Sequence, residues 1–273
     1  MAAPVAVTCV LVLPGFTHRI ANQDRDIAVE VMLAAPAAGF RRAASPALRL
    51  PGARGLVAGS DDRRIRVDVA EIAWFDLKLA TGQSLLERCA TGFSLLWYWL
   101  LSPASWPAVR TGRVTAVGLA LAALGLVLWF LSLLAVGLDG LVQGLGAVFG
   151  AESLPAWLPG AAKAVAPVGG LLLILLAWAS GSPTFEALPG FTRDWLRNAA
   201  AQGVGLRQRT RMRVQARIDE AREAGYGRIV VIAHSIGAAF LIDALANAEH
   251  AEDLEVVTLG APVGFLAARH PPL

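Results

Sequence analysis

A single serine near the end of the sequence stands in a setting suited to nucleophilic catalysis. In the stretch GRIVVIAHSIGAAFLIDAL, residues 227–245, five apolar residues lead towards Ser235 and small apolar residues follow it. A serine hydroxyl is a weak nucleophile, so it needs exposure, a base to take its proton, and hydrogen-bond donors for the oxyanion that forms. A tight turn from a strand into a helix meets two of these needs. It pushes the serine out of the sheet, and it leaves the amide of Ile236 free at a helix N-terminus.

The residues around the serine fit such a turn. Because the turn crowds the neighbouring backbone, the positions two before and two after the serine must be small, and here they are Ala233 and Gly237. His234 completes the turn, and we expect its side chain to point away from the serine hydroxyl. The competing interpretation is that Ser235 caps the helix that follows, which is a common role for serine. A cap requires neither Gly237 nor the alanines, so we favour the nucleophile.

The stretch resembles the nucleophile elbow of the α/β-hydrolase family of lipases and esterases, which reads G-x-S-x-G between a strand and a helix. The first glycine of that pattern is alanine here. LVLPGFTHR, residues 11–19, is similar to the family's strand and the loop that supplies the second oxyanion amide. By this resemblance the donor would be the backbone N–H of Phe16 or Thr17. VVTLGAP, residues 256–262, looks like the strand after the elbow helix, and nothing in residues 93–182 takes part in the resemblance.

The resemblance identifies the catalytic base and acid less clearly than the nucleophile. In the family the catalytic residues follow the order serine, acid, histidine along the chain. His270 is the only histidine that fits this order, although it comes sooner after the strand at 254–259 than the family's histidine does. His18 lies in the expected oxyanion loop, where it either lines the pocket or, as we favour, is a surface residue, and His250 is expected to be solvated at a helix end. Neither Asp243 nor Asp253 occupies the usual position of the acid.

Three explanations stay open. The chain is a C-terminally truncated piece of a longer hydrolase, a hydrolase-like protein that lost catalysis, or an enzyme with an unusual base. We favour truncation, because about half a sheet is present and a parallel sheet cut here leaves an open edge strand.

The elements that must position the serine alternate between strands and helices. We expect strands at residues 5–13, 65–75, 228–233 and 254–259, and helices at residues 23–38, 193–224 (interrupted near Gly203 and Gly205) and 236–248. This alternation predicts a parallel sheet with right-handed crossovers. The predicted fold class is therefore α/β: a partial, α/β-hydrolase-like parallel sheet with helices on both faces, interrupted by a two-helix transmembrane hairpin.

The interruption is indicated by composition. Of the 273 residues, 56% are hydrophobic and only 16% are charged, whereas a soluble domain has about a quarter charged residues. Residues 114–138 carry no charge, and neither do residues 164–185, which contain LLLILLAW and Pro167. We expect transmembrane helices at residues 114–138 and 164–182, because a soluble core helix rarely runs so long without a charge. Residues 93–109, rich in tryptophan, suit either the headgroup region or a core helix.

The arginines predict the topology. Arg110 and Arg113 precede the first span and RQRTRMR, residues 207–213, follows the second, whereas the loop at 139–163 has one lysine and two acids. The positive-inside rule then places both termini in the cytoplasm of an inner-membrane protein with two spans. Three segments follow: 1–92 and 184–273 as parts of the α/β domain, and 93–183 as the membrane insertion. We expect RQRTRMR to face anionic lipid rather than nucleic acid, because no aromatic residues interleave it.

The function predicted from these features is that of a membrane-anchored serine hydrolase, of esterase or lipase type, with an apolar acyl or lipid-like substrate. The alternatives are a non-catalytic membrane protein with a binding or scaffold role, or an inactive truncated fragment. We expect no cofactor and no metal, because no metal cluster, phosphate loop or dinucleotide fingerprint is visible. The two cysteines, Cys9 and Cys89, do not suggest a disulfide framework.

Overall fold

The computed structural model describes residues 6–16, 20–43, 49–59, 65–77, 85–101, 103, 113–180, 187–201, 203–246, 248 and 251–269. The chain forms two compact units. The sheet unit comprises Met1–Lys78 and Arg197–Val263, and the helical unit comprises Leu79–Leu196 and Gly264–Leu273. The short helix α9 (Val263–Arg269) begins at the last of the three boundaries between them in the sequence.

The sheet unit contains a six-stranded sheet in the order β2-β3-β4-β1-β7-β8. Its strands are β1 (Ala6–Leu13), β2 (Arg41–Arg42), β3 (Arg54–Ala58), β4 (Ile65–Glu71), β7 (Arg228–His234) and β8 (Leu254–Leu259). The four strands β4, β1, β7 and β8 pair in parallel, which confirms the predicted parallel α/β sheet. The strands β2 and β3 extend it in antiparallel fashion, in a region where we expected no strand. That prediction was wrong because proline, glycine and arginine dominate this region, and the apolar run within RGLVA is only three residues long.

The sheet joins strands from both sides of the apolar segment. β1 precedes that segment and β7 follows it, and the two strands pair directly, with Leu13 opposite Ala233. On the outer sides of this pair, Val12 lies opposite Glu71 and His234 lies opposite Leu259. The carboxyl ends of all four parallel strands therefore meet at one edge of the sheet.

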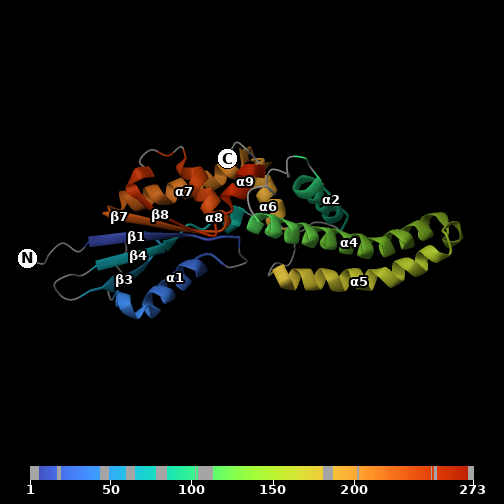
Figure 1. The fold of residues 1–273 in the computed structure, drawn as a ribbon, viewed down its shortest axis with the longest axis horizontal. Helices are drawn as coiled ribbons and strands as arrows, with labels where there is room; N and C mark the ends of the chain where they lie inside the picture. Colours follow the sequence, from blue (N-terminus) through green and yellow to red (C-terminus); the bar gives the residue numbers. More distant parts are fainter. Residues whose placement is uncertain are drawn as a thin grey trace, which may run out of the picture. The chain divides into compact units, whose positions relative to one another are not determined.

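Helices cover both faces of the sheet, as Figure 1 shows. α1 (Gln23–Ala34) packs on one face, where Val29 joins Val10, Val67 and Val69 in a buried apolar cluster. α7 (Leu206–Glu223) and α8 (Ile236–Leu245) lie on the other face. α7 turns one stripe inward at helical spacing, with Leu206, Thr210, Val214, Ile218 and Ala221 buried.

Several predicted elements differ from the observed ones at their ends. α1 stops at Ala34 and a short 3₁₀ turn, Pro36–Ala38, follows, because a proline disfavours helical backbone in the residue before it. β4 ends at Glu71, and the residues after it form a 3₁₀ turn, Phe75–Leu77. The helix expected at 193–224 is divided into α6 (Ala187–Leu196) and α7 by a small hairpin of β5 (Ala200–Ala201) and β6 (Val204–Gly205).

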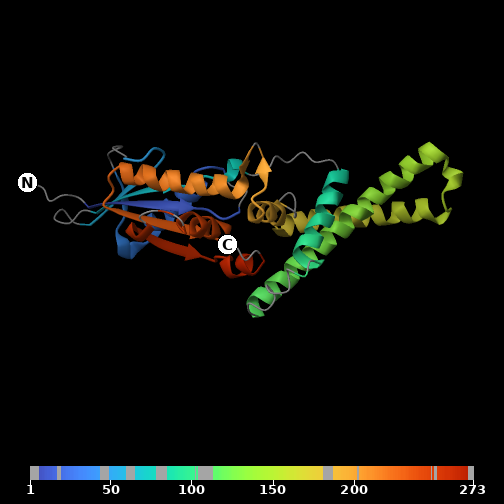
Figure 2. The same ribbon diagram turned by 90° about the horizontal axis from the view of Figure 1, so that it is seen from above.

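The helical unit contains two helices that are long and apolar enough to cross a membrane. They are α4 (Arg113–Phe149) and α5 (Trp157–Ser180), whose qualifying stretches are Ala123–Phe149 and Trp157–Trp178. The two helices run side by side as a hairpin (Figures 1 and 2), and a 3₁₀ turn, Ala151–Ser153, lies between them.

The two helices are longer than the spans that we predicted. Most of the loop expected at 139–163 is helical, because a charged residue does not by itself end a helix. Asp139 stays on the surface of α4, where its carboxylate accepts a hydrogen bond of 2.7 Å from the Gln143 side chain one turn later. Pro167 lies inside α5 without ending it.

Small residues bring the helices of this unit together. A Cβ atom on Gly169 would lie 2.7 Å from the Cβ of Ala135 and 2.8 Å from the carbonyl oxygen of Ser132, so α5 approaches the backbone of α4 closely. α2 (Leu85–Leu96) packs on α4 in the same way, because a Cβ on Gly92 would lie 2.3 Å from the ring of Trp129. A π-helical turn, Trp97–Leu101, continues α2. Of the tryptophan-rich segment 93–109, residues 102 and 104–109 lie outside the described residues.

Candidate active site

The backbone of Ser235 has a conformation that few non-glycine residues adopt. Its φ is 54° and its ψ is −126°, at the junction between β7 and α8. Such a conformation is strained for a residue with a side chain and persists only when the surroundings impose it. The side chain forms no capping hydrogen bond with α8, so the structure does not show the capping role that competed with catalysis.

The neighbours of the serine are small for a steric reason. A Cβ on Gly237 would lie 2.5 Å from the carbonyl oxygen of Pro14 and 2.8 Å from that of Leu13. Ala233, two residues before the serine, is completely buried. The helix after the serine can therefore start against the end of β1 only because position 237 has no side chain.

The residues that follow β1 touch the elbow from the side. A Cβ on Gly15 would lie 2.9 Å from the Cβ of Ser235 and 2.9 Å from Nδ1 of His234. The backbone before Phe16 is thus in contact with the serine. Phe16 is the only one of the two expected oxyanion donors that lies in the described part of the chain, because Thr17 lies outside it.

The elbow is also held from the other flank. The amide of Ser235 donates a hydrogen bond of 2.8 Å to the carbonyl oxygen of Leu259 at the end of β8. The carbonyl oxygen of Ser235 accepts a bond of 3.0 Å from the amide of Ala238. Ile236 is the first residue of α8, so its amide has no acceptor within the helix.

Aromatic side chains lie around the residues that touch the serine. The Phe16 ring centroid is 6.2 Å from that of Trp74, and the Trp74 ring contacts Phe240 of α8 edge-on at 5.0 Å. Phe75 stacks on Trp74 at 5.3 Å. Trp74 and Phe240 are almost completely buried, whereas Phe16 and Phe75 are partly exposed. The site therefore has an apolar side.

The structure places only some of the residues considered as base or acid. His18, His250 and His270 lie outside the described residues, and His234 is exposed. Asp253 ends a 3₁₀ turn before β8, at the amino end of that parallel strand, whereas Ser235 follows the carboxyl end of β7.

Asp243 is committed to another interaction. It is buried in α8 and accepts hydrogen bonds from Nε of Arg207 at 2.9 Å and from Nη2 of Arg211 at 3.1 Å. In the described residues, no three His, Cys, Asp or Glu side chains gather as a metal site.

Several arginines of the basic run at residues 207–213 on α7 form ion pairs within the protein. Arg207 and Arg211, one turn apart, bind Asp243, and Arg213 pairs with Asp76 at 2.9 Å. These arginines were expected to face lipid. The spacing of 207 and 211 places both on one helix face, but the partner on α8 was not visible in the sequence around them.

A buried acid at the same edge of the sheet was missed. Glu71 ends β4, is 5% exposed, and binds backbone amides at the start of α1. An acid at the end of an apolar run gives no signal that separates such a role from a solvated strand end.

Comparison of the chain with protein-family models, with curated proteins and with solved structures found no match. The geometry of the site is thus the basis on which a function can be argued.

Proposed function

We propose that this protein is a membrane-anchored serine hydrolase that uses Ser235 as its nucleophile and cleaves esters of apolar acyl groups. The observation that carries the proposal is the strained backbone of Ser235 at the end of an inner parallel strand, with its side chain not used as a helix cap. Such strain gathers at functional sites, where the surroundings maintain it.

The residues of the elbow have definite roles in this reaction. Ser235 Oγ attacks the ester carbonyl carbon while a base takes the hydroxyl proton, and the carbonyl electron pair moves onto oxygen. The amides of Ile236 and of Phe16 or Thr17 donate hydrogen bonds to that oxyanion. The intermediate then collapses, the alcohol leaves with the proton from the base, and water releases the acyl group by the same steps. His270 is the proposed base, by its position after the serine in the chain.

The aromatic residues support an apolar substrate. Phe16 and Phe75 are partly exposed, and both pack on the buried Trp74, whose indole binds the carbonyl oxygen of Pro14. An acyl chain that contacts these rings would gain binding energy from the apolar area it buries.

The membrane anchor rests on α4 and α5. Both helices expose large apolar side chains, including Leu131 of α4 and Ile174 and Trp178 of α5, the last at 83% exposure. β1 and β7 lie on either side of this hairpin in the sequence and pair in one sheet. A sheet does not form across a bilayer, so an even number of crossings is required, and two spans satisfy it.

Labelling with a fluorophosphonate probe tests the proposal. The probe reacts with an activated serine, so the full-length protein in detergent should become labelled, with the label on the peptide that contains Ser235. Ser235→Ala should reduce labelling to background, because no other hydroxyl occupies the elbow. A thermal unfolding midpoint close to that of the wild type would show that the variant is folded.

The outcome that contradicts the proposal is equally clear. Folded wild-type protein that does not label, or a Ser235→Ala variant that labels equally well, would leave the non-catalytic binding or scaffold role as the better explanation.

A further inference from the structure

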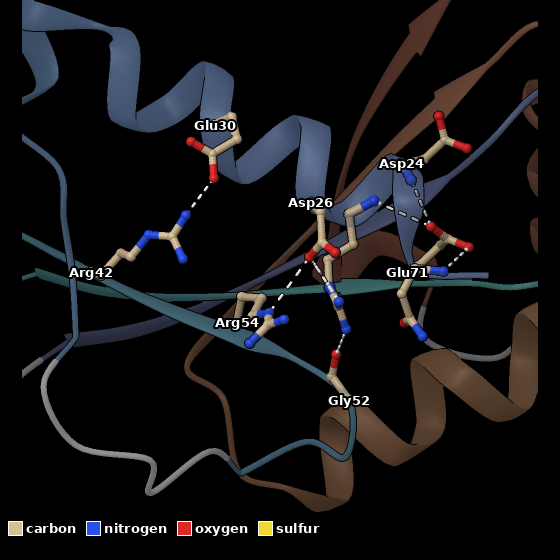
Figure 3. A network of polar contacts seen from close by, with 9 residues as sticks. Asp24, Asp26, Glu30, Arg42, Gly52, Arg54 and Glu71 are labelled. Atoms are coloured by element: carbon tan, nitrogen blue, oxygen red, sulfur yellow. Dashed lines mark hydrogen bonds and ion pairs between the residues drawn. The ribbon is translucent and has the colours of Figure 1, made fainter. Parts of the chain in front are cut away.

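The start of α1 is held by a carboxylate from another element. Its N-cap residue, Asn22, has a φ of 71° and forms no side-chain capping hydrogen bond. Instead, the Glu71 carboxylate at the end of β4 accepts three backbone hydrogen bonds, as Figure 3 shows. The donors are the amides of Asn22 at 3.0 Å, Asp24 at 3.0 Å and Arg25 at 3.2 Å. A buried carboxylate at a helix N-terminus is stabilised both by these amides and by the helix dipole.

The residues that directly follow β4 also hold the end of β1. The amide of Ile72 donates to the carbonyl oxygen of Val12 at 2.8 Å, and the indole Nε1 of Trp74 donates to the carbonyl oxygen of Pro14 at 2.9 Å. Trp74 is 1% exposed, so this bond is shielded from water. The Pro14 carbonyl oxygen is also the atom that approaches Gly237 most closely.

These contacts fix the backbone that touches the serine from two sides. On one side Trp74 binds Pro14, two residues before Phe16. On the other side Glu71 fixes the first residues of α1, which the chain reaches after Phe16. The backbone of Gly15 and Phe16 thus lies in the chain between two points, Pro14 and the start of α1, that are both bound by residues 71–74.

We infer that Glu71 is a positioning residue of the hydrolase, which acts together with Trp74 by holding the Phe16 amide where the oxyanion forms. This inference rests on the proposed function. Glu71 touches neither substrate nor serine, and its effect reaches the reaction only through the backbone of residues 14–16 and of the start of α1. Because a displacement of about 1 Å can cost roughly 100-fold in rate, a modest shift of this backbone should slow acylation strongly.

Glu71→Gln tests the inference. Glutamine keeps the size of the side chain but has one oxygen acceptor in place of two and no charge, so three amides can no longer be bound. The measurement is the rate of fluorophosphonate labelling as a function of probe concentration, together with the fraction of protein labelled at completion. We expect the maximal labelling rate to fall roughly 10- to 100-fold. The probe concentration at half-maximal rate and the final labelled fraction should stay unchanged.

This combination separates positioning from mere stabilisation. Protein that cannot refold lowers the final labelled fraction, and reversible unfolding lowers the apparent rate only in proportion to the folded fraction, which circular dichroism measures. A displaced oxyanion donor lowers the rate by much more than that proportion and leaves the final fraction unchanged. Asp26→Asn is the matched control. Asp26 lies in the same first turn of α1, but its carboxylate binds the side chains of Arg25 and Arg54 rather than backbone amides (Figure 3). It should label at the wild-type rate.

A second variant covers the case in which Glu71→Gln does not fold. Trp74→Phe keeps a large ring but removes the hydrogen bond to Pro14, and it should also slow labelling at an unchanged final fraction. Wild-type labelling rates in folded Glu71→Gln or, where that variant is unfolded, in Trp74→Phe would overturn the inference. If Ser235→Ala abolishes labelling while these variants react normally, only the inference fails. If the wild type itself does not label, the proposed function fails with it.

Discussion

At the scale of single residues, the elbow depends on two glycines that are needed for space rather than for an unusual backbone. Neither Gly15 nor Gly237 has a positive φ. Each would bring a Cβ atom into the backbone or side chains of the facing segment at less than 3.0 Å. The strained residue is instead the serine itself, whose conformation persists because both neighbouring strands hold it.

Gly237→Ala should therefore damage both the fold and the site. The added methyl group would lie 2.5 Å from the Pro14 carbonyl oxygen, so α8 or the end of β1 must move. Overpacking of this kind costs about 1–3 kcal/mol. We expect the free energy of unfolding to fall by that amount and fluorophosphonate labelling of Ser235 to slow, as measured by denaturant titration and by labelling kinetics.

Gly227→Ala supplies the control for this prediction. Gly227 precedes β7, and a Cβ atom there would meet no atom within 4 Å. The same chemical change at that position should alter neither stability nor labelling. A Gly237→Ala protein as stable and as reactive as Gly227→Ala would show that the elbow does not have the tight geometry described.

Cys9 offers a test of the buried side of the sheet. Burial raises the pKa of its thiol to about 12, and the nearby Asp68 carboxylate adds to the increase. The unfolded thiol has a pKa of about 8.5. The thiol thus stays protonated in the folded state at pH values at which it ionises in the unfolded state. Its contribution to the free energy of unfolding is therefore fully present below about pH 8 and is lost as the pH rises towards 12.

The wild-type protein should consequently lose stability relative to Cys9→Ala between pH 7 and pH 9.5, by about 1 kcal/mol. Denaturant titrations of both proteins at the two pH values measure this difference. Replacement of Cys89 by serine in both proteins leaves Cys9 as the single thiol. An unchanged difference between the two pH values would mean that the thiol ionises equally well in the folded state.

At the scale of elements, the sequence was informative wherever apolar runs were long or local sterics were strict. The strands before and after α8, β7 and β8, were predicted nearly to the residue, because short runs rich in valine and isoleucine between polar and glycine residues mark strands. The need for small residues around Ser235 could also be read from the sequence, because it concerns positions within two residues of the serine.

The sequence was uninformative where an element or interaction depends on a partner that is distant in the chain. β3 pairs with β4, and β2 pairs in turn with β3, whereas strands of two or five residues carry little pattern of their own. The cap of α1 comes from Glu71, 46 to 49 residues away from the amides that it binds. The arginines of α7 bind Asp243, 32 to 36 residues away. Interactions across such separations leave no trace in local spacing.

The ends of the helices within the apolar segment were predicted wrongly, because a charged residue does not by itself end a helix. The predicted spans ended at charged residues, whereas α4 continues past Asp139 to Phe149. Its 37 residues correspond to about 55 Å, which exceeds the ~30 Å hydrocarbon core. In the proposed membrane arrangement α4 therefore either tilts or projects beyond the hydrocarbon region.

At the scale of the whole molecule, the shared sheet makes the proposed topology testable. Because β1 and β7 belong to one sheet, the proposed topology requires the sheet unit to lie on one side of the membrane and the turn between α4 and α5 to lie on the other. By the positive-inside rule, the arginines beside the spans assign the sheet unit to the cytoplasm in the proposed topology. Single cysteines report each location once Cys9 and Cys89 have been replaced.

Glu152→Cys lies in the turn between α4 and α5, and Met212→Cys lies on α7 at a residue that is 56% exposed. With a membrane-impermeant maleimide, we expect Glu152→Cys to react in spheroplasts prepared from intact cells, because only the hairpin turn lies outside. Met212→Cys should react only after the membrane is opened by detergent. Its reaction in detergent is the control that the thiol is accessible. Equal reaction of both cysteines in intact spheroplasts, or of neither, is incompatible with a two-span hairpin that interrupts a cytoplasmic sheet.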